Sequence, residues 1–153
     1  MTLAVGAQAP DFTLTDHMGN EVTLSSLLRE RAVLVVFYPF AFSGVCTGEL
    51  TGFRDRLGDF ETDSATLVAI SCDPVFSLRA FADRDALFFP LLSDFWPHGE
   101  VSRAYDAFSD EIGASTRRSY LIARDGTIAW AAETELAVAR DLDAAAAAVA
   151  ALV

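Results

Sequence analysis

The residues with the clearest chemical potential stand where an apolar run meets a helical pattern. The run Val33–Tyr38 ends at Pro39, Ser43 follows four residues later, and Cys46 comes three residues after Ser43. Cysteine reacts as its thiolate, and an ordinary thiol with a pKa of about 8.5 is only slightly ionised at neutral pH. A helix that begins here offers unpaired N–H groups and a partial positive charge, which both favour an anion. The spacing therefore makes Cys46 a candidate nucleophile.

The start of a helix does not ionise a thiol by itself. Lowering a thiol pKa by about 2 units requires about 2.7 kcal/mol, and a helix terminus usually supplies less. We therefore expect a cation from another part of the chain. Ser43 can hydrogen-bond the thiolate or a substrate oxygen, or cap the helix, and Pro39 can shape the loop and shield the sulfur. From the residues alone, Cys46 is equally consistent with a small buried core side chain.

Two apolar runs predict the buried strands that position this junction. Residues 33–38 and 66–72 are rich in β-branched side chains and suit strands covered on both faces. Between them, apolar residues recur at spacings of three and four, which predicts one amphipathic helix. Those residues are Leu50, Phe53, Leu57 and Phe60.

The rest of the chain predicts two hairpins and further helices. Residues 12–24 predict an N-terminal β-hairpin. After this hairpin, Ser25 or Ser26 is expected to cap a short helical turn. Residues 117–130 predict a second hairpin around Asp125-Gly126. Asp73 is expected to cap a helix that starts at Pro74. The Ala-rich segment 136–152 favours a closing helix. The order of elements predicts one α/β domain with a mixed sheet covered on both faces.

Composition limits the partners of the chain. Its 153 residues carry 11 basic and 22 acidic side chains, a net charge of −11, which disfavours nucleic acids and anionic membranes as partners. The two cysteines lie 26 positions apart and form no C-x-x-C pair, and the two histidines, His17 and His98, would complete a zinc site with them only if carboxylates assist, so no metal is expected. The sequence has no apolar run of about 20 residues and no basic-apolar leader pattern, so a soluble cytoplasmic protein is expected.

The pattern Pro39-x-x-x-Ser43-x-x-Cys46 resembles the peroxiredoxin signature of proline, threonine or serine, and the peroxidatic cysteine. Further similarity covers nearly the whole chain and is found at Ala9–Leu14, Phe37–Pro39 and Phe89–Asp94. Phe40–Cys46 and Asp94–Gly99 are similar in particular to the one-cysteine alkyl hydroperoxide reductase E branch. The resemblance implies a thioredoxin-like fold for residues 1–153, with a central mixed β-sheet flanked by helices and an N-terminal β-hairpin.

The resemblance also implies the chemistry. A thiol-dependent peroxidase of this family reduces hydrogen peroxide, organic hydroperoxides and peroxynitrite through a cysteine sulfenic acid, with no cofactor, and it forms homodimers or higher homo-oligomers. The family uses an arginine on a later strand, and counting nine residues back from Gly126 selects Arg117. Arg118 is the rival, but a regular strand points it to the opposite face. Glu49 either orients Arg117 or is simply an acid favoured near a helix start.

The sequence gives no obvious thiol to reduce the sulfenic acid. Position 51 is Thr51, where one subgroup has its resolving cysteine, and residues 144–153 contain no cysteine. Cys72 is the one intramolecular candidate, although a cysteine that ends an apolar strand is usually buried and inert. We therefore expect an external thiol reductant: mycothiol with mycoredoxin, as the resemblance suggests, or a glutaredoxin-type or thioredoxin-type protein.

Two alternatives remain open at this stage. The first is a two-cysteine mechanism that uses Cys72. The second is a thioredoxin-fold redox or binding module without peroxidase activity, in which Cys46 is structural; a disulfide reductase is disfavoured because the chain has no C-x-x-C motif. The loop with Phe95, Trp96 and His98 is expected to line the substrate entrance or a homodimer interface, or to anchor the core. His98 is a candidate base for a cysteine hydrolase or a helix cap, and the sequence offers no persuasive third residue for a hydrolase.

Overall fold

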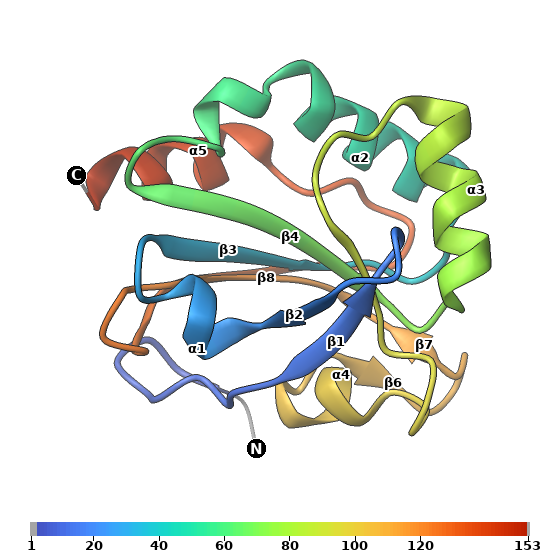
Figure 1. Ribbon diagram of the computed structural model, residues 1–153, viewed down its shortest axis with the longest axis horizontal. Coiled ribbons are helices and arrows are strands. Elements are labelled where there is room, and N and C mark those ends of the chain that lie inside the picture. The colour runs from blue at the N-terminus through green and yellow to red at the C-terminus, as the bar shows by residue number, and fades with distance from the viewer. Residues whose placement is uncertain (1–2, 153) are drawn as a thin grey trace.

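The computed structural model describes residues 3–152 as a central sheet between two layers of other elements (Figure 1). Seven strands form the sheet in the order β2-β1-β5-β4-β3-β8-β9. They are β1 (Thr13–Asp16), β2 (Glu21–Thr23), β3 (Ala32–Phe37), β4 (Ala65–Ser71), β5 (Leu91–Ser93), β8 (Arg117–Ile122) and β9 (Ile128–Thr134). The strands β6 (Phe108–Ser109) and β7 (Ala114–Ser115) form a separate antiparallel pair.

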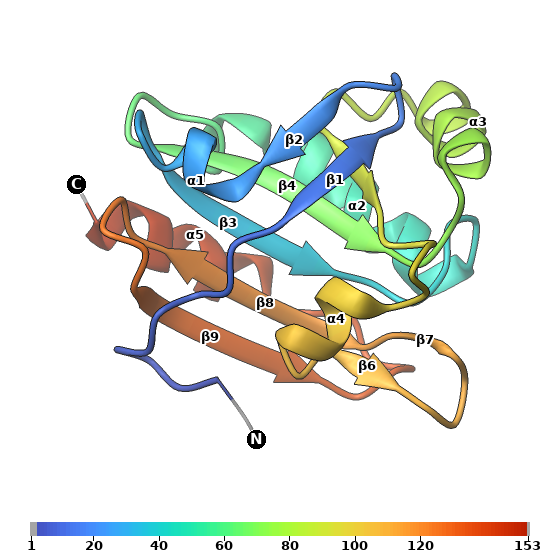
Figure 2. The same ribbon diagram turned by 60° about the horizontal axis from the view of Figure 1, so that its bottom comes forward.

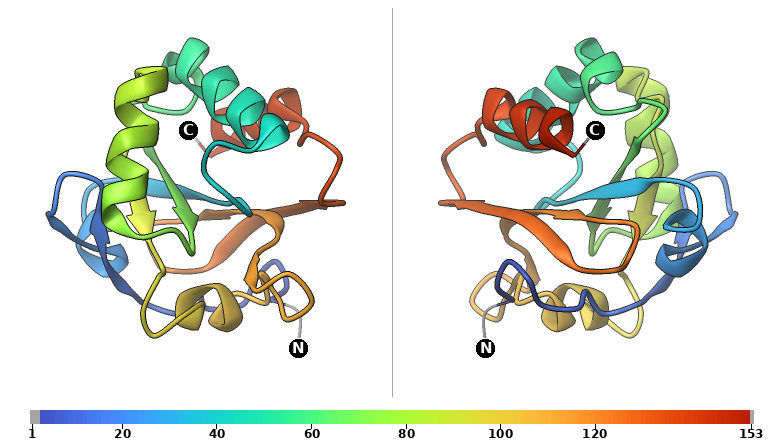
Figure 3. Two further views of the ribbon diagram at one scale, coloured as in Figure 1. Left: turned by 90° about the vertical axis from the view of Figure 1, so that its right-hand side faces the viewer. Right: turned by 90° about the vertical axis from the view of Figure 1, so that its left-hand side faces the viewer.

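The helices lie on both faces of this sheet. They are α1 (Leu24–Leu27), α2 (Gly44–Asp55), α3 (Val75–Asp85), α4 (Glu100–Ala104) and α5 (Leu142–Ala151), with a 3-10 turn, η1, at Leu57–Asp59. Figure 3 shows α2, α3 and α5 on one face, whereas α4 and the β6–β7 pair lie on the other. None of the helices described in residues 3–152 is long and apolar enough to cross a membrane.

The two central strands are buried as the sequence predicts. Every residue of β3 and of β4 is buried, and the two strands pair in parallel, with Val35 opposite Val68. Strand β8 pairs antiparallel on the other side of β3, so the sheet is mixed (Figure 2). Successive side chains of β3 point to opposite faces of the sheet and belong to two apolar clusters. Leu34 and Val36 pack under α2, and Val33 and Val35 face the opposite layer. The predicted α/β class is confirmed.

The predicted hairpins are also present. Strands β1 and β2 pair antiparallel with Leu14 opposite Val22, and β8 and β9 pair antiparallel around the turn that contains Gly126. Gly126 has φ of +88°, a backbone conformation that glycine adopts at no steric cost. The N-terminal β-hairpin of the sequence prediction is confirmed. The short helix α1 is preceded by Thr23, so the prediction that Ser25 or Ser26 caps it was wrong.

Three helix boundaries differ from the prediction. Helix α2 ends at Asp55, and Leu57 enters η1 instead of continuing the apolar face. Helix α3 begins at Val75, with Pro74 as its N-terminal flanking residue, so Asp73 is not the cap. Helix α5 begins at Leu142, because Asp141 accepts a hydrogen bond from the N–H of Ala144 and fixes the helix start there. Residues 136–141 are therefore free to reach the region around Cys46.

Candidate active site

Cys46 is the third residue of α2 and lies within the first helical turn. Its side chain is fully buried, in the apolar cluster between α2 and the sheet. The first backbone hydrogen bond of the helix runs from the N–H of Thr47 to the carbonyl of Ser43, at 2.8 Å. The N–H groups before Thr47 are consequently those that a helix start leaves unpaired, and they favour negative charge at this position.

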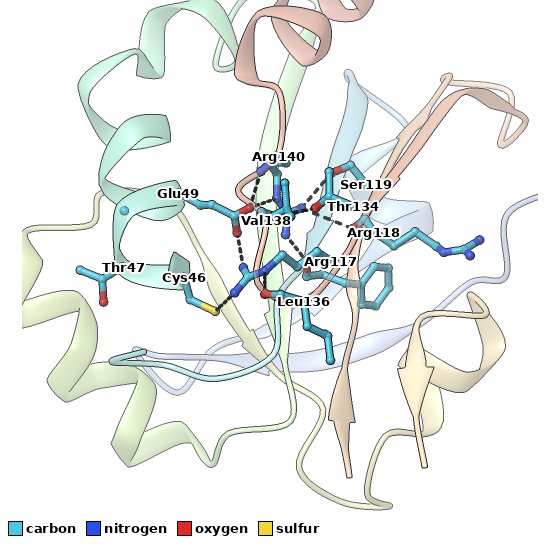
Figure 4. A network of polar contacts seen from close by, with 12 residues as sticks. Cys46, Thr47, Glu49, Arg117, Arg118, Ser119, Thr134, Leu136, Val138 and Arg140 are labelled. Atoms are coloured by element: carbon cyan, nitrogen blue, oxygen red, sulfur yellow. Dashed lines mark hydrogen bonds and ion pairs between the residues drawn. The ribbon is translucent and has the colours of Figure 1, made fainter. Parts of the chain in front are cut away.

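Arg117 supplies the cation that the sequence argument required. It is the first residue of β8, is 3% exposed, and donates from Nη2 to the Cys46 Sγ at 3.2 Å (Figure 4). Its Nη1 donates to Glu49 Oε1 at 2.6 Å, and its Nε donates to the carbonyl of Leu136 at 2.6 Å. Three acceptors, two on α2 and one at Leu136, therefore hold the guanidinium in place with its Nη2 against the sulfur.

Arg118 points the other way, as the alternation of a strand requires. It pairs with Glu133 on β9 and donates from Nη1 to the Tyr120 hydroxyl at 3.2 Å. Figure 4 shows its guanidinium directed away from Cys46. The structure thus brings Arg117, and not Arg118, to the sulfur.

Glu49 lies behind Arg117 and is almost completely buried. It is the sixth residue of α2, beyond the first turn, so the explanation that it merely complements the helix start was wrong. Its Oε1 accepts from Arg117 and its Oε2 accepts from the backbone N–H of Arg140 at 2.7 Å and from Arg140 Nε at 3.1 Å. A buried carboxylate bound on both oxygens fixes the position of both arginines.

Arg140 is the site residue that the sequence argument missed. Besides Glu49, it donates to the carbonyl of Phe37 and, at 2.8 Å, to the Ser119 hydroxyl. Burial lowers the pKa of this guanidinium and the Glu49 carboxylate opposes that shift, and an arginine side chain in a protein stays protonated. No local pattern identifies it, because it lies in a segment whose alanine content suggests helix.

The loop before α2 is held by Asp73. Asp73 Oδ2 accepts from the backbone N–H of Ala41 at 2.8 Å and from the Ser71 hydroxyl at 2.7 Å. Phe42 has φ of +70°, a conformation that is uncommon for a bulky residue. Its ring packs against Phe81 at 5.1 Å between centroids, and the Arg84 guanidinium lies over the ring at 4.7 Å. These contacts close the loop over the helix start.

Pro39 and Ser43 frame this loop at its two ends. Pro39 is buried and follows the last residue that pairs with β4, Tyr38, whose N–H donates to the carbonyl of Ile70. Ser43 stands at the N-cap position of α2, but its side chain makes no capping hydrogen bond. Among the described residues, no hydrogen bond joins the Ser43 hydroxyl to the sulfur; the one made to Cys46 Sγ comes from Arg117. The start of α2 thus positions Ser43, and its hydroxyl makes neither a capping hydrogen bond nor one to the sulfur.

Cys72 lies on the opposite side of the sheet. Its sulfur is 3.5 Å from the Ser115 hydroxyl, which in turn is 2.7 Å from the hydroxyl of Ser102 on α4. Figure 3 shows α4 and α2 on opposite faces of the sheet. Burial raises the pKa of the Cys72 thiol, and both cysteines are free. The structure therefore does not bring Cys72 to Cys46. No cluster of three or more potential metal ligands is found in residues 3–152.

The fold and the thiol–arginine pair define the class: a thioredoxin-like protein with a buried cysteine at a helix start beside a fixed cation. Residues 5–131 match the AhpC/TSA family. Over 139 residues, and 91% of each chain, the sequence is 44% identical to alkyl hydroperoxide reductase E of Mycobacterium tuberculosis and of Mycobacterium bovis. It is 33% identical to the chloroplastic 2-cysteine peroxiredoxin of Chattonella marina, over 94% of this chain and 77% of that one.

Solved structures agree with the sequence matches. The crystal structure of peroxidoxin BcpB from Mycobacterium tuberculosis superposes with a TM-score of 0.87 at 30% identity, and the match covers 99% of each chain. The chain belongs to the AhpC/TSA family of peroxiredoxins, which confirms the predicted thioredoxin-like fold. It is a thiol-dependent peroxidase, an oxidoreductase of antioxidant defence.

Proposed function

We propose that Cys46 is the single reacting thiol of a one-cysteine peroxidase. The observation that carries this proposal is the contact of 3.2 Å between Arg117 Nη2 and the Cys46 sulfur, two buried side chains that meet at the start of α2. A charged donor at this distance in a site with little water favours the thiolate over the thiol. Cys46 is thereby the nucleophile, Arg117 the charge partner, and Pro39, Ser43 and Glu49 the residues that shape and orient the site.

The reaction balances with a peroxide as the oxidant. The thiolate attacks one peroxide oxygen, a sulfur–oxygen bond forms, and the oxygen–oxygen bond breaks. The departing oxygen takes the bond pair and, after protonation, leaves as water or an alcohol; from peroxynitrite it leaves as nitrite. Arg117, the helix-start N–H groups and the Ser43 hydroxyl are the donors available to the oxygens as their charge grows. The product is a Cys46 sulfenic acid, which thiols can reduce.

An external thiol completes the cycle in this proposal. The thiol condenses with the sulfenic acid to give a mixed disulfide and water, and a second thiol releases Cys46. Cys72 is a poor intramolecular partner because its side chain contacts Ser115 on the other side of the sheet and burial favours its protonated form. The similarity to mycobacterial alkyl hydroperoxide reductase E makes mycothiol with mycoredoxin the first reductant to test, followed by glutaredoxin-type and thioredoxin-type proteins.

The substrates we propose are hydrogen peroxide, organic hydroperoxides and peroxynitrite. The names of the 44% identical relatives specify alkyl hydroperoxides as substrates of those proteins. Phe40 and Phe42 belong to the loop that covers Cys46 and have partly exposed aromatic rings, so an apolar substituent on the peroxide can contact them. Because Cys46 is fully buried, this loop must move for a peroxide or a reductant to reach the sulfur.

We also propose a homodimer and a cytoplasmic location for this chain, folded as one domain. Exposed aromatic side chains support the homodimer: Trp96 is 82% exposed, and Phe95 and Phe76 are exposed as well. Large exposed apolar side chains of this kind often mark a protein interface. Two free cysteines are compatible with a reducing compartment.

The proposal is tested by turnover with a panel of reductants. Wild-type protein, Cys46→Ser and Cys72→Ser are each supplied with hydrogen peroxide and with mycothiol plus mycoredoxin, a glutaredoxin or a thioredoxin. We expect turnover with at least one reductant in the wild type and in Cys72→Ser, and none in Cys46→Ser. Loss of turnover in Cys72→Ser with every reductant would support the two-cysteine alternative.

A further inference from the structure

A cavity of about 140 Å³ lies at one edge of the sheet, between β8, β9 and the start of α5. The pairing of β8 with β9 places Ser119 opposite Ala132, and both side chains line the cavity from the sheet. Ala144 and Ala145 line it from α5. These four small side chains leave a space that larger ones would fill, although protein interiors contain few voids larger than a water molecule.

The buried part of this cavity is polar, and the part nearer to solvent is mainly apolar. Ser119, Arg117 and Arg140 line the cavity and are buried side chains (Figure 4). Trp130 and Ala132 also line it, but they are only half-buried, because β9 is the last strand of the sheet. An apolar cavity with a few converging polar groups is the usual form of a site for a small molecule.

The polar groups in the cavity favour a ligand that accepts a hydrogen bond. The Ser119 hydroxyl accepts from Arg140 Nη1 at 2.8 Å and makes no other hydrogen bond within residues 3–152. A hydroxyl also has one proton to donate, so this proton is available to a ligand oxygen. The Nε, Nη1 and Nη2 of Arg117 each already donate to another group, so Arg117 contributes positive charge to the cavity.

The charges at the exposed part of the cavity favour a neutral ligand over an anion. Glu133 and Asp141 line this part, and both residues are exposed. Their carboxylates repel an anion that approaches from solvent, whereas a neutral molecule meets no such repulsion. The volume sets the size of the ligand, because an apolar cavity of about 150 Å³ holds one benzene ring.

We propose that this cavity is a binding site for a small, neutral and mainly apolar molecule that carries one acceptor oxygen, an alcohol or a phenol. Cys46, Ser43 and Glu49 do not line the cavity, so it is separate from the place where the peroxide reacts. The proposal therefore does not depend on the proposed function. Arg117 lines the cavity and also contacts the Cys46 sulfur, so a bound ligand lies next to the charge partner of that sulfur.

Tryptophan fluorescence tests the proposal, because Trp130 lines the cavity. The chain has two tryptophans, so Trp96→Phe leaves Trp130 as the single reporter. Phenol is titrated into this parent protein, with excitation at a wavelength that phenol does not absorb, and a saturable change is expected. Ala144→Leu and Ala132→Val each fill the cavity and are expected to weaken phenol binding by about tenfold or more. Ala147→Leu is the matched control on α5, since its side chain is exposed and does not line the cavity.

Ser119→Ala tests the role of the hydroxyl. It is expected to weaken phenol binding by about fivefold, the usual effect of one hydrogen bond, and to leave the binding of benzene unchanged. The inference is overturned if phenol gives no saturable change in the parent, or if Ala144→Leu and Ala147→Leu bind phenol equally well. Ala132→Val replaces Ala144→Leu in this comparison if the latter folds poorly by circular dichroism. A failure of the proposed function would instead appear as peroxide turnover that survives in Cys46→Ser, whatever the result with phenol.

Discussion

Replacing Arg117 with glutamine removes the charge that contacts the sulfur of Cys46, the proposed nucleophile. The variant keeps an amide that can donate a hydrogen bond, but it loses the contact of 3.2 Å between guanidinium and sulfur and the ion pair of 2.6 Å to Glu49. Because both contacts are buried, solvent does not replace the lost charge. We expect two losses: a smaller thiolate fraction at neutral pH, and less stabilisation of the charge that moves onto the peroxide oxygens.

The size of the effect follows from these two losses. Removing an opposite charge within hydrogen-bond distance usually shifts a titration by about 1 to 3 units, and removing one donor from a charge-stabilising site costs about 100- to 1,000-fold in rate, or about 2.7–4 kcal/mol. The two effects overlap, because the same contact serves both. We expect the rate constant of Cys46 oxidation by hydrogen peroxide at pH 7 to fall by about 100- to 1,000-fold.

Stopped-flow tryptophan fluorescence measures this rate. Trp130 packs against the cluster that contains Cys46 and can report its oxidation. Arg118→Gln is the control, since Arg118 is the next residue on β8 and faces away from the sulfur. Arg118→Gln is expected to react at nearly the wild-type rate. An Arg117→Gln rate within threefold of wild type (a difference of about 0.7 kcal/mol), or equal impairment of the two variants, would refute the reasoning.

Three further outcomes are expected. Asp73→Ala leaves the N–H of Ala41 without its acceptor and is expected to lower the free energy of unfolding by about 1–3 kcal/mol and to slow Cys46 oxidation. Asp73→Asn keeps one side-chain oxygen and is expected to lose less of this free energy. Urea unfolding and stopped-flow oxidation measure the two effects. Phe42→Ala removes the ring that packs on Phe81 and is expected to speed alkylation of Cys46 by a bulky maleimide, and an unchanged rate would show that this ring does not close the loop. Burial raises the pKa of Cys72, so the folded state holds the thiol proton more tightly than the unfolded state does. The free energy of unfolding should therefore fall as pH rises above the thiol pKa of the unfolded state. In urea titrations, Cys72→Ser should show a smaller fall than wild type between pH 8 and pH 10, about the range of ordinary thiol ionisation.

The sequence predicts the parts of the site that depend on local pattern. The apolar run before Pro39 makes β3, and the helical spacing after Cys46 makes α2, so the thiol at their junction can be placed without a structure. Alternation along β8 also separates Arg117 from Arg118, because only one of two successive residues can face α2. Recognising the motif adds the expectation that the arginine and the cysteine meet.

The sequence analysis missed or misassigned the site residues whose contacts lie far away along the chain. Asp73 has the sequence context of a helix cap, yet its carboxylate holds Ala41, which lies 32 positions earlier. Residues 136–141 are rich in helix-forming residues, but tertiary contacts of Leu136 and Arg140 keep them out of the helix. Arg140 reaches Glu49 across 91 positions, a separation at which single-sequence periodicity carries no information.

The most direct test of the account is the identity of the oxidised sulfur. Reduced wild-type protein and Cys72→Ser are each treated with one equivalent of hydrogen peroxide in the presence of dimedone, and the products are mapped by mass spectrometry. We expect one dimedone adduct per chain, on Cys46, in both proteins. An adduct on Cys72, or a disulfide between Cys46 and Cys72 in the wild type, would contradict it.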